Sequence, residues 1–369
     1  MNSNTAFEHI SPIPVRTWRG ARVNDASLSL EGYEDLSAHS PAEEAITAAA
    51  GISVTSLSKE FALPELGAAQ SAIASSVLEY MEHNANRAWL VTLEAGQTAQ
   101  EPLVFDYNLT SQAPALADNI VIHAGRGSSV TVVIRYRSEC NPGEAGGFHS
   151  GLTRIYAEEG ARVKLVKVQT LSENDRHADH VAAMVQKEAE VSVVLAELGG
   201  AQGVGNCNLH LAGEGAVGKL DTIYLGDGSR RLDLNYRIAF SGARAFGNIR
   251  THGILHHTSR KIYRGTLDFL RGAKGAKGRE EEYTTLLSPD VRNISVPLLL
   301  CGEDDVEGAH ATSTGSLSER QVFYLMSRGL SEGQVKRILV EASFAPVLDR
   351  MGEALAEEIR LLVSKRLEE

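Results

Sequence analysis

GSSVTVVI, residues 127–134, and EAEVSVVL, residues 188–195, are two copies of the pattern that decides the fold. In both copies a turn pair with a small second residue leads into apolar side chains at every second position, which is the period of a β-strand. The second members of successive pairs lie 33, 28, 27, 27 and 30 residues apart. The pairs are Gly127-Ser128, Gly160-Ala161, Glu188-Ala189, Gly215-Ala216, Gly242-Ala243 and Gly272-Ala273.

Nearly even spacing of this kind predicts a stack of repeats, because one repeat is too short to bury a core alone. The sequence therefore predicts a mainly β fold, a parallel β-helix or solenoid. An antiparallel sandwich would also contain many short strands, but it would not require such even spacing. One copy is irregular: Lys167 breaks the alternation, Val166 and Val168 continue it one residue out of phase, and a β-bulge is predicted there.

The chain after the repeats is predicted to be helical, since Ser318 with Gln321 and Ser331 with Gln334 have the spacing of helix-capping boxes. Gly329 stands where a left-handed helix end is expected. Two further helices are predicted over 332–344 and 351–367, with Pro346 breaking the chain between them. This tail could cap the solenoid or present a surface to a partner.

The chain before the repeats is predicted to be partly extended and partly helical. A helix is expected to start at Ser40, with Pro41 in its first turn, and another over 66–83; Trp18 is expected to anchor the lead. The expected organisation is an N-terminal extended and helical region (1–85), a β-helix core (86–315) and a C-terminal helical domain (316–369).

Composition limits the possible partners. The 369 residues carry a formal charge of −11, which disfavours nucleic acid or an anionic membrane as the main partner. Three widely separated cysteines define neither a disulfide framework nor a four-thiolate metal site, so a reducing compartment is expected. The N-terminus has no signal-peptide pattern, and no apolar run reaches the roughly 18 residues of a membrane span. We expect a cytoplasmic protein.

No enzyme motif is complete in this sequence. RGAKGAKGRE (271–280) resembles a phosphate loop, but Lys277 is followed by glycine where a Walker loop needs Ser or Thr. The histidines of HADH (177–180) and THGILHH (251–257) lack a matching carboxylate or thiolate, so stacked ladders are expected in place of a metal site. The acidic run 303–307 lacks the ligand order of a calcium loop. His310, taken alone, is expected to pack or hydrogen-bond.

Three segments resemble a known family: EDDVEGAHATSTGSLSERQVFYLMSRGLS (303–331), ILVEASFAPVLDR (338–350) and PVRTW (14–18). They are similar to the SufB/SufD family of iron-sulfur cluster assembly proteins, and to its SufD branch in particular. The resemblance covers most of the chain and is most specific from about residue 235 to the end. It implies a right-handed parallel β-helix between helical regions.

The same resemblance implies a scaffold subunit and not an enzyme. A SufB homologue would pair with it through the ends of the β-helices, and the C-terminal helices would dock the SufC ATPase. His310 falls on the family's interface histidine and would be a ligand of the nascent iron-sulfur cluster, because imidazole suits iron. The residues implied in ATPase docking are Tyr324, Arg328, Gly329 and Phe344.

Two departures from SufB imply that the chain needs a partner. The SufB cysteine would fall within residues 282–286 and the interface glutamate on Ala311, and neither group is present. Cys301 follows an apolar run and is interpreted as a buried small hydrophobe. Two alternatives stay open: a homodimeric scaffold acting with SufC alone, and a carbohydrate-active β-helix enzyme, which would need a groove of acidic and basic residues that is not seen here.

Overall fold

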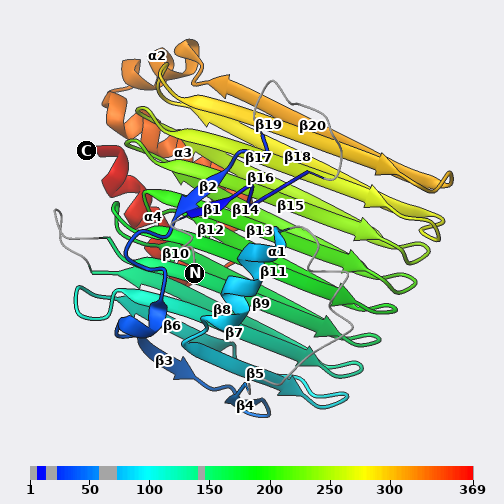
Figure 1. Ribbon diagram of the computed structural model, residues 1–369. Coiled ribbons are helices and arrows are strands. Elements are labelled where there is room, and N and C mark those ends of the chain that lie inside the picture. Colours follow the sequence, from blue (N-terminus) through cyan, green and yellow to red (C-terminus); the bar gives the residue numbers. More distant parts are fainter. Residues whose placement is uncertain (1–5, 14–22, 58–72, 140–145, 369) are drawn as a thin grey trace.

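The chain is wound into two parallel sheets that face each other, with one strand of each sheet in every coil (Figure 1). The computed structural model describes residues 6–13, 23–57, 73–139 and 146–368. We call the sheets the odd sheet, in the order β19-β17-β15-β13-β11-β9-β7-β5-β4, and the even sheet, in the order β20-β18-β16-β14-β12-β10-β8-β6-β3. The predicted parallel β-solenoid is therefore confirmed.

The strands of the first coils are short, and most of the later ones have about ten residues. The odd sheet contains β4 (Ser53–Ser56), β5 (Arg87–Leu93), β7 (Ala115–Ala124), β9 (Phe148–Ala157), β11 (Arg176–Val185), β13 (Gln202–Leu211), β15 (Arg231–Phe240), β17 (Arg260–Phe269) and β19 (Arg292–Cys301). The even sheet contains β3 (Glu43–Thr47), β6 (Leu103–Leu109), β8 (Ser129–Ser138), β10 (Arg162–Thr170), β12 (Glu190–Glu197), β14 (Val217–Gly226), β16 (Phe246–Leu255), β18 (Ala276–Leu286) and β20 (Val306–Ser316).

The turn pairs that revealed the repeat lie just before the strands of the even sheet. Gly127, Gly160, Glu188 and Gly215 all have positive φ, as their place in a tight turn requires. The last two predicted pairs are displaced from this position, because the register aligns Val217, Phe246 and Lys277. The equivalent pairs there are Arg244-Ala245 and Gly275-Ala276, and Arg244 and Gly275 have the positive φ.

The predicted bulge at Lys167 is wrong. β10 pairs with β8 and β12 in an unbroken register through this residue. Leu165 and Lys167 face the interior, whereas Val166 and Val168 face outward and pack against the C-terminal helices. The alternation fails in the sequence because both faces of this strand are buried and the interior accepts a lysine.

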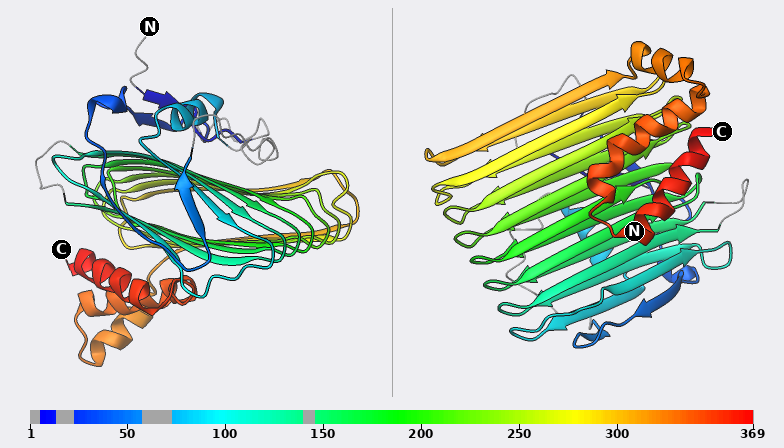
Figure 2. Two further views of the ribbon diagram at one scale, coloured as in Figure 1. Left: turned by 90° about the horizontal axis from the view of Figure 1, so that it is seen from below. Right: turned by 180° about the vertical axis from the view of Figure 1, so that it is seen from behind.

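An N-terminal layer covers the odd sheet (Figure 2). It consists of β1 (Ala6–Glu8) paired antiparallel with β2 (Ser27–Ser29), the 3-10 turn η2 (Leu36–Ala38) and helix α1 (Ser75–His83). The helix predicted to start at Ser40 is wrong: residues 43–47 form β3, which extends the even sheet instead. Trp18 and residues 66–72 of the second predicted helix lie outside the described residues.

Three C-terminal helices follow on the opposite side from the N-terminal layer (Figure 2): α2 (Glu319–Ser327), α3 (Glu332–Leu348) and α4 (Glu353–Glu368). Helices α3 and α4 pack against the even sheet, and α2 packs against α3. The predicted caps are confirmed: Ser318 accepts from the Gln321 amide, and Ser331 with Gln334 forms a reciprocal capping box. Gly329 has φ +94°. Pro346 does not separate two helices, because it lies in the last turn of α3, which continues through it to Leu348. None of the described helices is both long and apolar enough to cross a bilayer.

The two ends of the solenoid differ. At the first end, the short strands β3 and β4 pair antiparallel with β6 and β5. At the other end, β19 and β20 are full-length edge strands. Within the described residues no strand pairs with their outer edges, so we call this coil the open end.

Candidate functional site

The open end carries the histidine that the sequence singled out. His310 is in the middle of β20, and every residue of that strand from Glu307 to Ser316 is exposed. It aligns with Glu280 of β18. Aligned residues of neighbouring strands point to the same face, and Glu280 belongs to the inward-facing, buried row of β18. His310 therefore lies on the interior side of the last coil, and solvent still reaches it.

Beneath His310 is a set of polar side chains that we call the end layer: Lys261, Tyr263, Glu280, Glu282, Thr284 and Ser295. Lys261 is buried and forms an ion pair with Glu282. It also donates to Ser295 Oγ at 3.0 Å. The Tyr263 hydroxyl donates to Glu280 Oε1 at 2.9 Å. The outermost interior of the solenoid is thus polar, although an apolar core fills most of the coils.

Burial shifts the Glu280 carboxyl toward its protonated form. Burial raises the pKa of this carboxyl to about 7, against the opposing effect of the Tyr263 hydrogen bond. Its Oε2 atom is buried and accepts no hydrogen bond. Gly265 makes room for the group, since a Cβ atom there would lie 2.7 Å from Glu280 Oε1 and from the Tyr263 hydroxyl. The end layer therefore contains a carboxyl group that can release or take up a proton.

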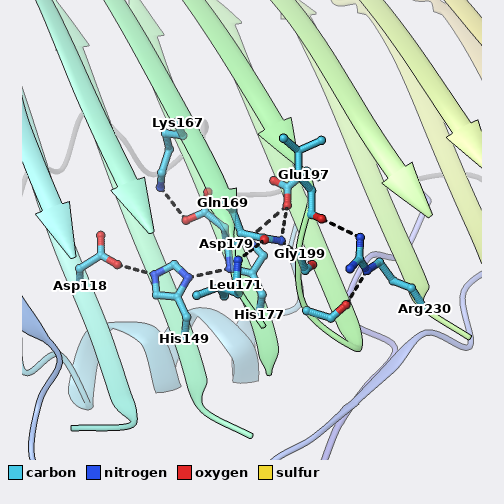
Figure 3. Close-up of polar contacts among 12 residues, drawn as sticks. Asp118, His149, Lys167, Gln169, Leu171, His177, Asp179, Glu197, Gly199 and Arg230 are labelled. Carbon is cyan, nitrogen blue, oxygen red and sulfur yellow. Dashed lines mark hydrogen bonds and ion pairs between the residues drawn. The ribbon is translucent and has the colours of Figure 1, made fainter. Parts of the chain in front are cut away.

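A second polar cluster lies deeper inside the solenoid (Figure 3), and we call it the central network: Asp118, His149, Lys167, Gln169, His177, Asp179 and Glu197. His149 contacts Asp118 and His177 at 2.6 Å each, and His177 lies 3.4 Å from Glu197. Lys167 pairs with Asp179 at 2.6 Å. The network joins side chains of both sheets.

The proton positions in the central network follow from its geometry. Burial lowers the pKa of His149 well below its usual value, so this imidazole is neutral. Its Nε2 faces the Asp118 carboxylate and must carry the hydrogen, which leaves Nδ1 as an acceptor. The facing Nδ1 of His177 is then the donor. The two stacked rings, 4.8 Å apart, thus form the ladder expected for HADH.

His180, the other histidine of HADH, faces away from this network. It is buried under the N-terminal layer side of the odd sheet, and neither ring nitrogen has a hydrogen-bond partner. Burial lowers its pKa to about 3. Of the THGILHH histidines, His252 stacks on Tyr283, and His256 contacts Ser288. Among the described residues, no three or more His, Cys, Asp or Glu side chains are grouped so as to hold a metal ion.

Helix α2 places Tyr324, Arg328 and Gly329 on an exposed surface. No residue of this helix is buried, and the Arg328 guanidinium lies 5.2 Å from the centre of the Tyr324 ring. The apolar stripe of α2 is also exposed, with Phe323 at 76%. Phe344 differs, because it is 1% exposed in the core between α3 and the even sheet.

The interpretation of Cys301 as buried is wrong. Cys301 ends the edge strand β19 and is exposed, because no further coil covers it. The polar interior was also missed. The signal for it was present in the sequence, since His149, Lys167, His177 and Asp179 alternate with other residues at the inward positions of three buried strands.

Fold and site define the chain as a parallel β-solenoid whose largely apolar interior contains two buried polar clusters, one of them at the open end. The family model for the SUF system FeS cluster assembly SufBD core domain matches residues 107–343. The chain therefore belongs to the SufB/SufD family of iron-sulfur cluster assembly proteins.

Curated relatives support the SufD branch of this family. The iron-sulfur cluster assembly protein SufD of Bacillus subtilis is 27% identical over 253 residues, which are 68% of this chain and 57% of that protein. A SufBD family protein of Staphylococcus epidermidis is 24% identical over 267 residues, 72% of this chain and 57% of the relative. One from Mycobacterium leprae is 25% identical over 221 residues, 60% of this chain and 25% of the relative. The chain thus spans little more than half of the first two relatives.

Proposed function

We propose that this chain is a SufD-like scaffold subunit of a cytoplasmic iron-sulfur cluster assembly complex. It pairs with a SufB homologue and binds a SufC-type ATPase, to which the nucleotide hydrolysis belongs. Family membership and the likeness to the Bacillus subtilis SufD protein support this role. The observation that carries it is the open end, where an exposed histidine stands on unpaired edge strands.

The nascent cluster is the substrate of this proposal, and His310 supplies one ligand to it. An imidazole nitrogen is a suitable donor for iron. The described residues contain no group of three ligands around it, and residues 282–286 contain no cysteine. The remaining ligands therefore come from the SufB homologue, whose strands pair with β19 and β20. Ala311 supplies no side-chain ligand next to His310.

The ATPase docks on α2 in this proposal. Phe323, Tyr324 and Met326 are 76%, 55% and 44% exposed, an unusual concentration of large apolar side chains on one short helix. Arg328 and Gly329 continue this surface at its end. Phe344 contributes indirectly, by packing α3 onto the even sheet.

The test compares His310→Ala with Thr312→Ala, which changes the next inward-facing residue of the same exposed strand. Each variant is co-expressed with a SufB homologue and a SufC-type ATPase, purified as a complex, and loaded anaerobically with iron and sulfide. We expect both variants to form the complex. The His310 variant should hold several-fold less iron and sulfide per complex, and the Thr312 variant should match the wild type.

Equal loading of the His310 variant would remove the ligand role. Failure of the wild-type chain to co-purify with either partner would remove the scaffold role. Stable loading of the chain with SufC alone would favour the homodimeric alternative, because the same open end can pair with a second copy of itself.

A further inference from the structure

Three arginines stand side by side at the starts of the last odd-sheet strands. Arg231, Arg260 and Arg292 are aligned in register on β15, β17 and β19. All three are exposed and lie on the outer face of the odd sheet. Neighbouring strands are about 4.8 Å apart, so the three positive charges follow one another at that interval. We call this row the arginine row.

In the part of the chain that the structure describes, no ion pair joins a carboxylate to the arginine row. Within the described residues, the side chains of Arg231, Arg260 and Arg292 make no hydrogen bond or ion pair. Two acidic residues, Asp25 and Asp233, lie in the same region, and only Asp233 is held by an arginine, Arg264. Both oxygens of Asp233 accept from Arg264, at 2.8 and 2.9 Å, and Asp25 lies 3.9 Å from His9.

The same row on the even sheet shows how the chain normally arranges such positions. There Arg162 is aligned between Ser129 and Glu190, and Lys277 forms an ion pair with Glu307 at 2.8 Å. Like charges directly opposite each other on neighbouring strands are destabilising. Three adjacent positive charges therefore do not stabilise the fold, and they stand out in a chain of net charge −11.

A cavity of about 450 Å³ adjoins the arginine row. Its floor is apolar, with Val204, Ile262 and Ile294, and residues 25–27 form one wall. That wall is fixed, because Arg264 is held by Asp233 and donates to the carbonyl of Val23. Gln202 also lines the cavity, and its buried Oε1 atom accepts no hydrogen bond.

We propose that this cavity binds an organic phosphate of the nucleoside diphosphate class. Each guanidinium group can donate two hydrogen bonds to the oxygens of one phosphate. A row of three arginines therefore matches two linked phosphoryl groups. The apolar floor matches a base. The phosphates lie against Arg231, Arg260 and Arg292, and the base lies on Ile262.

The test uses the full chain alone, with ADP and inorganic pyrophosphate as probes in calorimetry at low salt and without magnesium. The variant is Arg260→Gln, which removes the middle charge, and the matched control is Arg162→Gln on the even sheet. We expect Arg260→Gln to weaken ADP binding by about tenfold or more, as the loss of a bidentate contact would. Arg260→Lys should restore part of the affinity, and Arg162→Gln should bind as the wild type does.

Competition between pyrophosphate and ADP would support the placement of the phosphates on the arginine row. The proposal is overturned if wild-type protein does not bind ADP, or if Arg260→Gln binds it unchanged. Preferential binding of an oligoglutamate peptide over ADP would also overturn it and assign the row to an acidic protein segment. Since the isolated chain is measured, the outcome is independent of the scaffold role.

Discussion

At the scale of single residues, the interior of this solenoid uses charges as parts of its packing. Lys167 and Asp179, each 4% exposed, pair at 2.6 Å between the two sheets. Replacing one partner of such a pair leaves an uncompensated buried charge, so either substitution alone should lower the free energy of unfolding. The sequence marked Lys167 as an irregularity but not as an interior residue. Its partner is in another strand, so period and spacing along one strand could not identify the pair.

The raised pKa of Glu280 gives a testable dependence of stability on pH. Its pKa is about 7 in the folded protein against an ordinary value of 4.5. The folded state therefore binds this proton more tightly, and the resulting stability is full below about pH 4.5 and is lost as the pH rises to about 7. This difference corresponds to about 3 kcal/mol. Glu280→Gln, which cannot titrate, should gain free energy of unfolding relative to the wild type by this amount over that range.

Urea unfolding followed by circular dichroism at several pH values measures this difference. Glu281→Gln, on the outward face of the same strand, is the control. Parallel pH profiles of the wild type and the Glu280 variant would contradict the proposed protonation of the end layer.

At the scale of elements, local signals predicted the helices and failed for the first strands. Ser318 and Ser331 were identified as caps because capping depends on residues three apart. Residues 43–47 were assigned to a helix because Pro41 suits a first turn. They form a strand through pairing with β6, which is more than fifty residues away in the sequence and places Glu43 opposite Asn108. Pairing over such separations overrides local preference.

Helix α2 allows docking to be separated from folding. Phe323 is 76% exposed, so Phe323→Ser should change the free energy of unfolding by less than about 0.5 kcal/mol. It should nevertheless weaken capture of the SufC-type ATPase several-fold. Leu361→Ser on α4, at 64% exposure, is the matched control and should leave capture unchanged. Phe344→Ala should instead lower stability by about 3–5 kcal/mol, because it empties a core position.

Pull-down titrations with the ATPase and urea unfolding of the same variants provide both readings. Unchanged capture by Phe323→Ser would show that the ATPase binds elsewhere on the chain.

At the scale of the whole molecule, even spacing was enough to predict the solenoid, but not which faces are covered. Parts of the two outer faces are covered by opposite ends of the chain, the odd sheet by the N-terminal layer and the even sheet by α3 and α4. Strands such as β7 and β10 are therefore largely buried on both faces, and their sequences do not distinguish inside from outside. The candidate site was predictable as far as His310. The end layer beneath it depends on β17, β18 and β19 being neighbours.

The difference between the two ends limits self-association. β19 and β20 offer edges of 10 and 11 residues, whereas β3 and β4 have only 5 and 4. Among the described edge strands, those of the open end are the longest, so two chains joined there present only short described edges at their outer ends. Light scattering of the isolated chain should give a mass of at most two chains at every concentration. Thr312→Lys, which places a charge on the inward row of β20, should shift the protein toward the monomer. Continued growth of the mass with concentration would contradict this account.

The cover on the even sheet also has a consequence for synthesis. A ribosome releases β10, β12 and β14 well before the helices that shield Val166, Val194 and Ile223. Until α3 and α4 have been synthesised, this apolar surface of the nascent chain is exposed to solvent. Chaperones that recognise apolar surfaces can therefore bind this protein during a defined interval of its synthesis. The interval ends when α4 has folded onto the even sheet.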